Sequence, residues 1–390
     1  MERFRAPDPA VLLTREAASR AGLAASFAHG AGRVLYLATL LDPFSPDGTS
    51  RYPFLFEHAL EVFDRRQPAR ARTVELYFDP GLRTDVSIED LAVQWRKMGV
   101  RVVYAAAWVF DRRYTYDYDR LIRVCHANGI LVYAWFEFPQ VTPAFWKDYP
   151  EWREVAAAGK TLPSWRLAMN LANPACRQGA VHFMTSTLGR WPWDGVNLAE
   201  LSFDGKADGD QPRGMVPLNE DVRRSFRAQH GFDPLALFDR TSPHYWRRDP
   251  RGWQQFLDYR ADLVTELHRV FLTALQPFAA TGREVIVTIL DSLQHPEVRT
   301  DNGLDSAAIV GLLEETPFTL QVEDPARAWT DPPARYRELA RRYQAILPAG
   351  ARFMLDINVV PSRDVEATHL PSALAAGTEL VASVSAARAA

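Results

Sequence analysis

The stretch from Trp193 to Asp204, WDGVNLAELSFD, combines a turn, a short apolar strand and a carboxylate at the point where that strand must end. Asp194 and Gly195 form the turn, and Glu200 is the carboxylate. In α/β barrel enzymes the reacting groups lie at the C-terminal ends of the parallel strands. The stretch therefore predicts a buried parallel strand that carries Glu200 at the catalytic end of a barrel.

Short β-rich runs alternate with amphipathic helical segments from residue 73 onward. The predicted strands span residues 73–79, 100–108, 130–137, 195–201, 284–291, 317–323 and 352–358. The predicted helices span residues 87–98, 117–128, 175–189, 252–279, 303–315 and 333–346. Repeated strand-helix units of this length favour an α/β fold, a (β/α)8 TIM-type barrel, over a doubly wound sheet.

The eighth strand of this predicted barrel is missing, so the barrel is expected to be incomplete there. The last segment, Pro371 to Ala390, has the pattern of a helix that follows strand seven. Either the natural chain continues, or the upstream run Val34 to Leu40 closes the barrel. We favour a division in which residues 1–70 are an N-terminal extension or the tail of a preceding domain, and residues 71–390 are the barrel.

The composition is that of a soluble globular protein. Hydrophobic residues make up 47% of the 390 residues and the formal net charge is -3, so no nucleic-acid partner is expected. The longest apolar run, Val34 to Leu41, is too short to span a bilayer, and the start lacks the apolar segment of a signal peptide. We predict a soluble chain without a transmembrane segment, extracytoplasmic if it belongs to a longer exported protein. The oligomeric state leaves no signal in the sequence.

Metal and cofactor motifs are absent from the sequence. Cys125 and Cys176 lie outside any C-x-x-C pattern and are predicted to be buried, reduced thiols, and the nine histidines do not cluster. There is no G-x-S-x-G elbow, P-loop, G-x-G-x-x-G after a strand or H-E-x-x-H. We therefore predict neither a metal nor a cofactor.

Polar side chains recur near the ends of several predicted strands, and the alternation of a strand places them on one face. They are Glu75, Tyr77 and Asp79; Tyr133, Trp135 and Glu137; Gln321 and Glu323; and Asp356 and Asn358. Buried strands are normally aliphatic, and an unpaired buried carboxylate costs several kcal/mol. A shared water-lined pocket explains the set economically. The alternative to a pocket role, for any one of these residues, is a structural hydrogen bond to a neighbouring loop.

Two long segments follow predicted strands three and four, at residues 138–172 and 205–251. Loops after barrel strands build the active face, so these segments indicate an extended cleft. Surface padding is the alternative.

Two carboxylates across a cleft are what glycoside hydrolysis requires, because one protonates the leaving oxygen and the other attacks the sugar or activates water. Glu200 is the candidate acid/base, Glu323 the candidate nucleophile or second carboxylate, and Asp291 the competitor. The alternative for Glu323 and Asp291 is that they cap the following helices. The substrate-binding candidates are Tyr77, Asp79, Trp108, Trp135, Glu137, Asn197, Gln321, Asp356 and Asn358. Trp108 and Trp135 are the predicted stacking platforms, since aromatic rings pack well against sugar C–H surfaces.

Three segments resemble the second, third and fourth strands of the barrels known as family-10-like glycosylhydrolases. They are KMGVRVVY at 97–104, GILVYAWF at 129–136 and DGVN at 194–197. The run at 219–226, with 231–234 and 253–267, is similar to the segment after strand four in that family. The resemblance covers residues 73–360 and implies a glycosyl-hydrolase-like barrel. The acidic position of the family falls at Ala199 or Glu200, and Leu201 replaces its usual tyrosine.

The family also includes hydrolase modules fused behind polysaccharide deacetylases in bacterial exopolysaccharide processing. Residues 32–37 and the pair Tyr52-Pro53 resemble the end of such an upstream module. The resemblance thus implies a glycoside hydrolase that acts on a bacterial polysaccharide or oligosaccharide. Two alternatives stay open: a non-catalytic carbohydrate-binding barrel that uses the same aromatic residues, and a remnant of a metal-dependent deacetylase.

Overall fold

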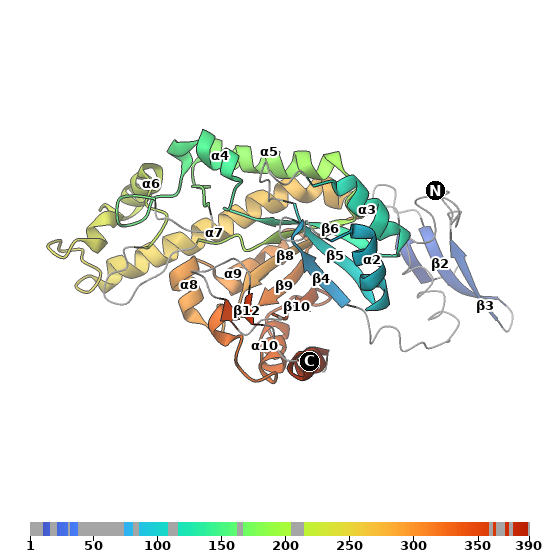
Figure 1. The fold of residues 1–390 in the computed structure, drawn as a ribbon. Coiled ribbons are helices and arrows are strands. Elements are labelled where there is room, and N and C mark those ends of the chain that lie inside the picture. Colours follow the sequence, from blue (N-terminus) through green and yellow to red (C-terminus); the bar gives the residue numbers. More distant parts are fainter. Residues whose placement is uncertain are drawn as a thin grey trace.

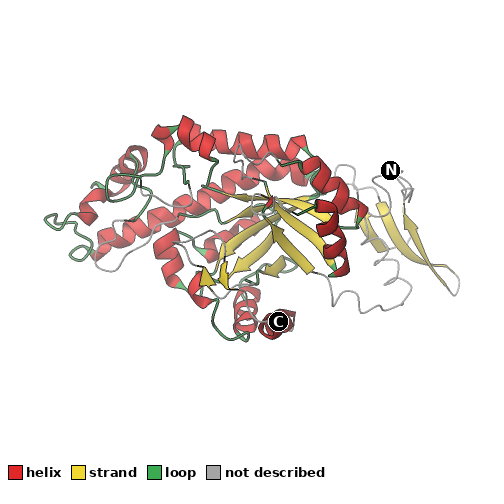
Figure 2. Ribbon diagram, in the orientation of Figure 1, coloured by secondary structure: helices red, strands yellow, loops and turns green. Residues whose placement is uncertain are grey.

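The protein is described from a computed structural model, which covers residues 11–15, 22–29, 32–37, 74–80, 86–107, 116–161, 167–203, 214–358, 362–363, 371–373 and 377–388. Its centre is a seven-stranded parallel sheet in which the strands follow one another in chain order. The strands are β4 (Val74–Phe78), β5 (Val100–Ala106), β6 (Leu131–Glu137), β7 (Gly195–Ala199), β8 (Glu284–Leu290), β9 (Thr319–Glu323) and β10 (Arg352–Leu355). The sheet curls into an incomplete (β/α) barrel, which confirms the predicted fold class (Figures 1 and 2).

The helices between the strands also match the sequence prediction, with one exception. They are α2 (Ile88–Lys97), α3 (Tyr118–Ala127), α5 (Pro174–Arg190), α7 (Pro250–Ala279) and α10 (Arg335–Gln344). The exception is the helix expected at 303–315, which begins later because Gly303 ends α8 (Pro296–Asn302) in a left-handed conformation. Asp305 then caps α9 (Ser306–Gly311), and a short turn η5 (Leu312–Glu314) follows.

The outward faces of the strands pack against these helices. Val103, Val132 and Leu198 are fully buried in this layer, as are Leu121 of α3, Met184 of α5 and other helical residues in the same cluster. Such near-continuous β-branched and aliphatic runs are typical of parallel strands that are covered on both faces. This explains why the local sequence predicted every strand of the sheet.

A polar layer fills the N-terminal end of the barrel interior. Glu284 accepts hydrogen bonds from Tyr133 Oη at 2.9 Å and Thr319 Oγ1 at 2.6 Å, and forms an ion pair with Arg352 at 2.7 Å. Tyr133 also fills the space beside Gly195, where an added Cβ would lie 2.5 Å from the tyrosine ring. This close approach requires glycine at the start of β7.

The two outer edges of the sheet lack a partner strand within the described residues. β3 (Gly32–Leu37) pairs with β2 (Gly22–His29), which pairs with β1 (Val11–Arg15), in a separate antiparallel sheet. The described part of the upstream run therefore does not close the barrel. Near the C-terminal end, β11 (Ser362–Arg363) pairs with β12 (Pro371–Ala373), and α11 (Gly377–Arg388) is the helix expected there.

The segments after β6 and β7 build structures beyond the C-terminal ends of the strands. The first holds α4 (Pro143–Asp148) and η3 (Pro150–Trp152), and the second holds α6 (Glu220–His230) and η4 (Pro234–Phe238). The second packs on the N-terminal half of α7, a helix of 30 residues that extends past the sheet (Figure 1). A separate apolar cluster holds this part together, through Met215, Leu218, Phe226, Leu237, Phe256 and Leu257.

Arg260 of α7 links these outer segments to the barrel. It is completely buried, and its guanidinium donates to the backbone carbonyls of Val216 at 2.7 Å, Asp301 at 2.8 Å and Thr300. Burial lowers the pKa of Arg260 to about 10, so it remains charged at neutral pH. One side chain thus holds one carbonyl of the loop before α6 and two carbonyls at the end of α8.

Two further predictions are that the cysteines are buried, reduced thiols and that the chain has no transmembrane segment. Cys125 and Cys176 are buried free thiols, as predicted, and burial raises the pKa of each to about 12. Among the helices that the structure describes, none has the length and apolarity needed to traverse a bilayer.

Candidate active site

A continuous hydrogen-bonded network crosses the barrel interior from β7 to β10. Thr288 Oγ1 donates to Asn197 Oδ1 at 2.9 Å, and Asn197 Nδ2 donates to Gln321 Oε1 at 2.9 Å. Gln321 Nε2 in turn donates to Asp356 Oδ2 at 3.3 Å. Asn197, Thr288 and Gln321 are buried. The structure therefore brings together three of the predicted binding residues and adds Thr288, which the sequence analysis did not identify.

Glu323 lies at the end of β9 and remains partly exposed. Asn358 Nδ2 donates to Glu323 Oε1 at 3.0 Å, so the tips of β9 and β10 are linked by two of the predicted site residues. A carboxylate that is both hydrogen-bonded and accessible can act on a substrate in the barrel mouth.

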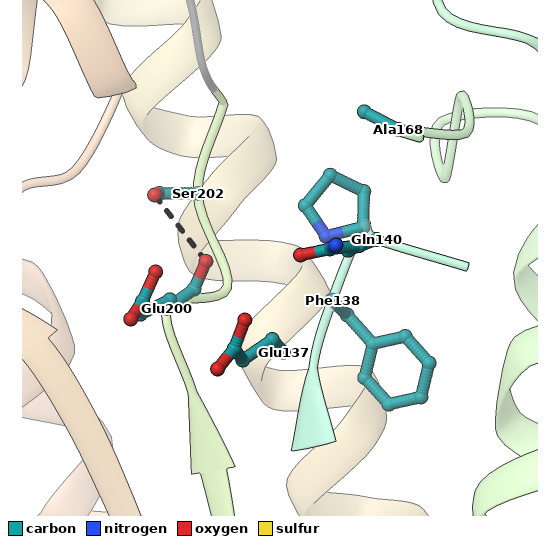
Figure 3. Close-up of a pocket in the computed structure, with 7 residues that line it drawn as sticks. Glu137, Phe138, Gln140, Ala168, Glu200 and Ser202 are labelled. Atoms are coloured by element: carbon teal, nitrogen blue, oxygen red, sulfur yellow. Dashed lines mark hydrogen bonds between the residues drawn. The ribbon is translucent and has the colours of Figure 1, made fainter. Parts of the chain in front are cut away.

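A pocket lies at the tips of β6 and β7 (Figure 3). It is lined by Glu137, Phe138, Pro139, Gln140, Ala168, Glu200 and Ser202. Glu137 pairs in register with Ala199, so Glu137 and Glu200 come from adjacent positions on neighbouring strands. Trp135 Nε1 donates to Glu137 Oε1 at 2.9 Å and fixes that carboxylate. The pocket thus contains two predicted site carboxylates.

The backbone of Glu200 is unusual. Its φ angle is 51°, and it is the only non-glycine residue with positive φ in the part of the chain that the structure describes. Glu200 N donates to Thr288 O at 3.2 Å, which ties this turn to β8. A left-handed conformation costs an L-residue about 1–2 kcal/mol, and such residues cluster at functional sites. Glu200, in this turn, lines the pocket with Glu137.

We expect Glu200→Gly to be more stable than Glu200→Ala by about 1 kcal/mol, because glycine adopts positive φ without steric cost. Both variants remove the carboxylate, so their difference isolates the backbone conformation. The measurement is the free energy of unfolding by denaturant. Equal stability of the two variants would show that the turn relaxes when the side chain is truncated.

The aromatic candidates occupy different positions. Trp135 is buried, with the rings of Tyr77 and Tyr104 edge-on at 5.1 and 5.9 Å, so it lies inside the barrel and positions Glu137. Tyr77 is 44% exposed. Asp79 follows β4 and is partly buried. Trp108 lies outside the described residues.

Asp291 lies on the opposite side of the sheet from the other candidates. It is completely buried, and its Oδ1 accepts hydrogen bonds from Tyr343 Oη at 3.0 Å and Leu293 N at 2.9 Å. Arg342 approaches its Oδ2 at 3.5 Å. Tyr343 and Arg342 belong to α10, which packs outside the barrel. These contacts give Asp291 a structural role, and we do not retain it as a catalytic candidate.

The pKa of Asp356 is raised well above the usual value of an aspartate. Burial, with a smaller contribution from the charge of Asp324, raises the pKa of Asp356 to about 6, against hydrogen bonds from Ile357 N and Gln321 that lower it. The folded protein therefore holds this proton at a higher pH than the unfolded chain, in which an aspartate has a pKa of about 4. The stability that the bound proton contributes is complete below about pH 4 and is lost as the pH rises through about 6.

We expect Asp356→Asn to unfold at nearly the same free energy as the wild type at pH 4, and to be more stable than it above pH 6 by about 1–3 kcal/mol. The neutral amide keeps the acceptor for Gln321 and removes the buried charge. Urea unfolding across this pH range measures the difference. A difference that is constant with pH would refute the shifted pKa of Asp356.

Three site residues were not identified from the sequence: Thr288, Gln140 and Ser202. Thr288 could have been found, because it shares the inward-facing parity of Glu284 in β8. Gln140 and Ser202 lie in loops, where no periodicity reports the direction of a side chain. As for metals, no cluster of three or more His, Cys, Asp or Glu with suitable geometry occurs among the described residues.

Comparisons with known proteins place this barrel in a structural class. No protein-family model matches the sequence, and no curated protein matches it. Its likeness to a solved structure agrees with the incomplete TIM-type (β/α) barrel described above.

Two solved structures illustrate the likeness. The cold-adapted β-galactosidase from Rahnella sp. R3 is similar with a TM-score of 0.51 and 15% identity, over 80% of this chain and 48% of that one. The PgaB (BpsB) glycoside hydrolase domain from Bordetella bronchiseptica is similar with a TM-score of 0.46 and 12% identity, over 76% of this chain and 95% of that one. The chain thus spans about half of the β-galactosidase.

Proposed function

We propose that this barrel is an O-glycoside hydrolase that acts on a bacterial polysaccharide, with Glu200 as general acid/base. The observation that carries the proposal is the strained turn at Glu200, a residue that lines a pocket with Glu137 at the C-terminal ends of the strands. The fold shared with glycoside hydrolases supports the same reaction class.

Glu323 is the proposed second carboxylate. Glu200 follows β7 and Glu323 ends β9, so β8 separates them. Neighbouring strands lie about 4.8 Å apart, which places these two strand tips about 10 Å apart along the sheet. Two glutamate side chains can close part of that span and leave room for a glycosidic bond, since hydrolases separate their carboxyls by about 5–9.5 Å. Glu137 belongs to β6, the strand next to β7, so a pair of Glu200 and Glu137 would leave less room for a glycosidic bond than Glu200 and Glu323.

The remaining residues have binding roles in this proposal. Glu137, Asp356 and Asn358 are the proposed hydrogen-bonding groups of the mouth, and the buried Asn197 and Gln321 position Asp356 from inside the barrel. Tyr77 offers its exposed ring to a sugar face. Glu200 protonates the leaving oxygen, and Glu323 either attacks the anomeric carbon or activates water.

The rival function is a carbohydrate-binding barrel without catalysis, because the same fold can carry either function. The discriminating experiment incubates the purified protein with a panel of bacterial exopolysaccharides and measures both released reducing ends and retardation in glycan-containing gels. Release of reducing ends supports the hydrolase. Retardation without release favours the binding barrel, and metal-dependent release of acetate favours the deacetylase remnant.

A further inference from the structure

Gln140 is an unusual member of the pocket. Only 7% of its surface is exposed, and its side-chain Oε1 is buried with no hydrogen-bond partner among the residues that the structure describes. A buried acceptor left unpaired costs about 1–3 kcal/mol. Buried polar groups in native proteins nearly always have partners, so an acceptor of this kind that lines a pocket is open to a donor from outside the chain, either a water or a ligand.

The backbone around Gln140 is held on both sides. Gln140 N donates to Glu137 O at 3.0 Å, and Gln140 forms an antiparallel bridge with Ala168. Met169 N donates to Pro139 O at 3.0 Å, and Val141 N donates to Leu167 O at 3.1 Å. The amide therefore projects from a fixed frame, and its oxygen faces the side of the pocket that holds Glu200 and Ser202 (Figure 3).

The pocket presents mainly acceptors around this oxygen. Glu137 and Glu200 carry carboxylates, and Ser202 Oγ points to the backbone carbonyl of Glu200 at 3.4 Å. A ligand group that satisfies Gln140 must therefore donate a hydrogen. Sugar hydroxyls are donors of this kind, and one placed here lies next to the proposed acid/base.

We infer that Gln140 is a specificity-determining residue, whose Oε1 accepts a hydrogen bond from one hydroxyl of the sugar unit beside Glu200. The inference rests on the proposed function and adds the group that selects the sugar. A site built to pair with a hydroxyl discriminates against an analogue that lacks it, because the acceptor is then left unpaired.

The test combines a protein variant with ligand deletions. The probes are methyl β-D-galactopyranoside, methyl β-D-glucopyranoside and their analogues in which one hydroxyl at a time is replaced by fluorine, which cannot donate. Ligand-observed NMR measures their dissociation constants with the wild type, Gln140→Met and the exposed control Gln229→Met. Methionine matches the size of glutamine and lacks the strong acceptor.

We expect one fluorinated analogue of one glycoside to bind the wild type and Gln229→Met about 3- to 10-fold more weakly than its parent. Gln140→Met should bind parent and analogue equally, and should melt at or above the temperature of the wild type because an unpaired acceptor is removed. Three results would overturn the inference. Gln140→Met could show the same loss of affinity for the fluorinated analogue, the wild type could show no selective loss, or neither glycoside could bind. Polysaccharide hydrolysis is scored separately, so the proposed function can survive that failure or fail on its own.

Discussion

Glu200→Gln is expected to lower kcat/KM for a polysaccharide by about 10²–10⁴-fold, the usual contribution of general acid–base catalysis. The amide keeps the size of the side chain and the positive φ of its backbone but cannot protonate a leaving oxygen. An aryl glycoside with a nitrophenolate leaving group needs little protonation, so its rate should fall much less. Initial rates with both substrate types measure this difference.

The control for this prediction is Glu338→Gln, an exposed glutamate of α10 far from the strand tips in sequence and paired with Arg341. It should retain full activity on both substrates. A loss that is equal for the two leaving groups would assign Glu200 the role of nucleophile. Full activity of Glu200→Gln would remove it from the mechanism altogether.

Arg260→Met is expected to destabilise the protein by about 3–5 kcal/mol, the typical cost of breaking a buried charged interaction. The substitution leaves three carbonyls, of Val216, Thr300 and Asp301, without this donor. The guanidinium also lies 5.4 Å from the centre of the Phe203 ring. Denaturant unfolding curves of the purified variant give the change.

The loss of Arg260 should also disturb the segment that follows Glu200 at the pocket. Phe203 N donates to Asn302 O at 2.9 Å, and Asn302 Nδ2 donates to Phe203 O at 2.8 Å. Asn302 follows two residues whose carbonyls Arg260 holds, so the segment after Glu200 depends on this arginine. Arg260→Lys should lose less stability, and the exposed Arg337→Met almost none. An Arg260→Met variant as stable as the wild type would refute the role of this buried cation.

The strands were predictable because each has a local pattern that no tertiary contact overrides. The β-branched runs VRVV and EVIVTIL lie in β5 and β8 as expected, and Gly99 and Gly129 mark the ends of the preceding helices through their positive φ angles. The closure of the barrel was not predictable. It depends on which edges pair, and sequence patterns within single elements do not report that.

The site was predictable only where strand alternation applies. Glu137, Asn197, Gln321 and Asp356 share the inward face, as the parity of their strands indicates. The same parity should have excluded Asp291, since Thr288 and Leu290 face inward and the next residue must face the helices. Its position at a strand tip made Asp291 a catalytic candidate. The direction of its side chain, toward the helices, argues against that role.

Gln140 could not be found in this way, because its direction is set by pairing with Ala168, 28 residues later in the chain. Trp108 follows the predicted second strand and lies outside the described residues, so its binding role stays a prediction. The same is true of the division at residue 70.

The most direct test of the central claim is hydrolysis in water labelled with the heavy isotope of oxygen. The purified protein is incubated with an exopolysaccharide, and mass spectrometry locates the label in the products. We predict one labelled oxygen at each new reducing end with the wild type, and a yield of labelled ends that is about 10²–10⁴-fold lower with Glu200→Gln over the same time. Products without label at the reducing end, or label found only in released acetate, would contradict glycoside hydrolysis by this barrel.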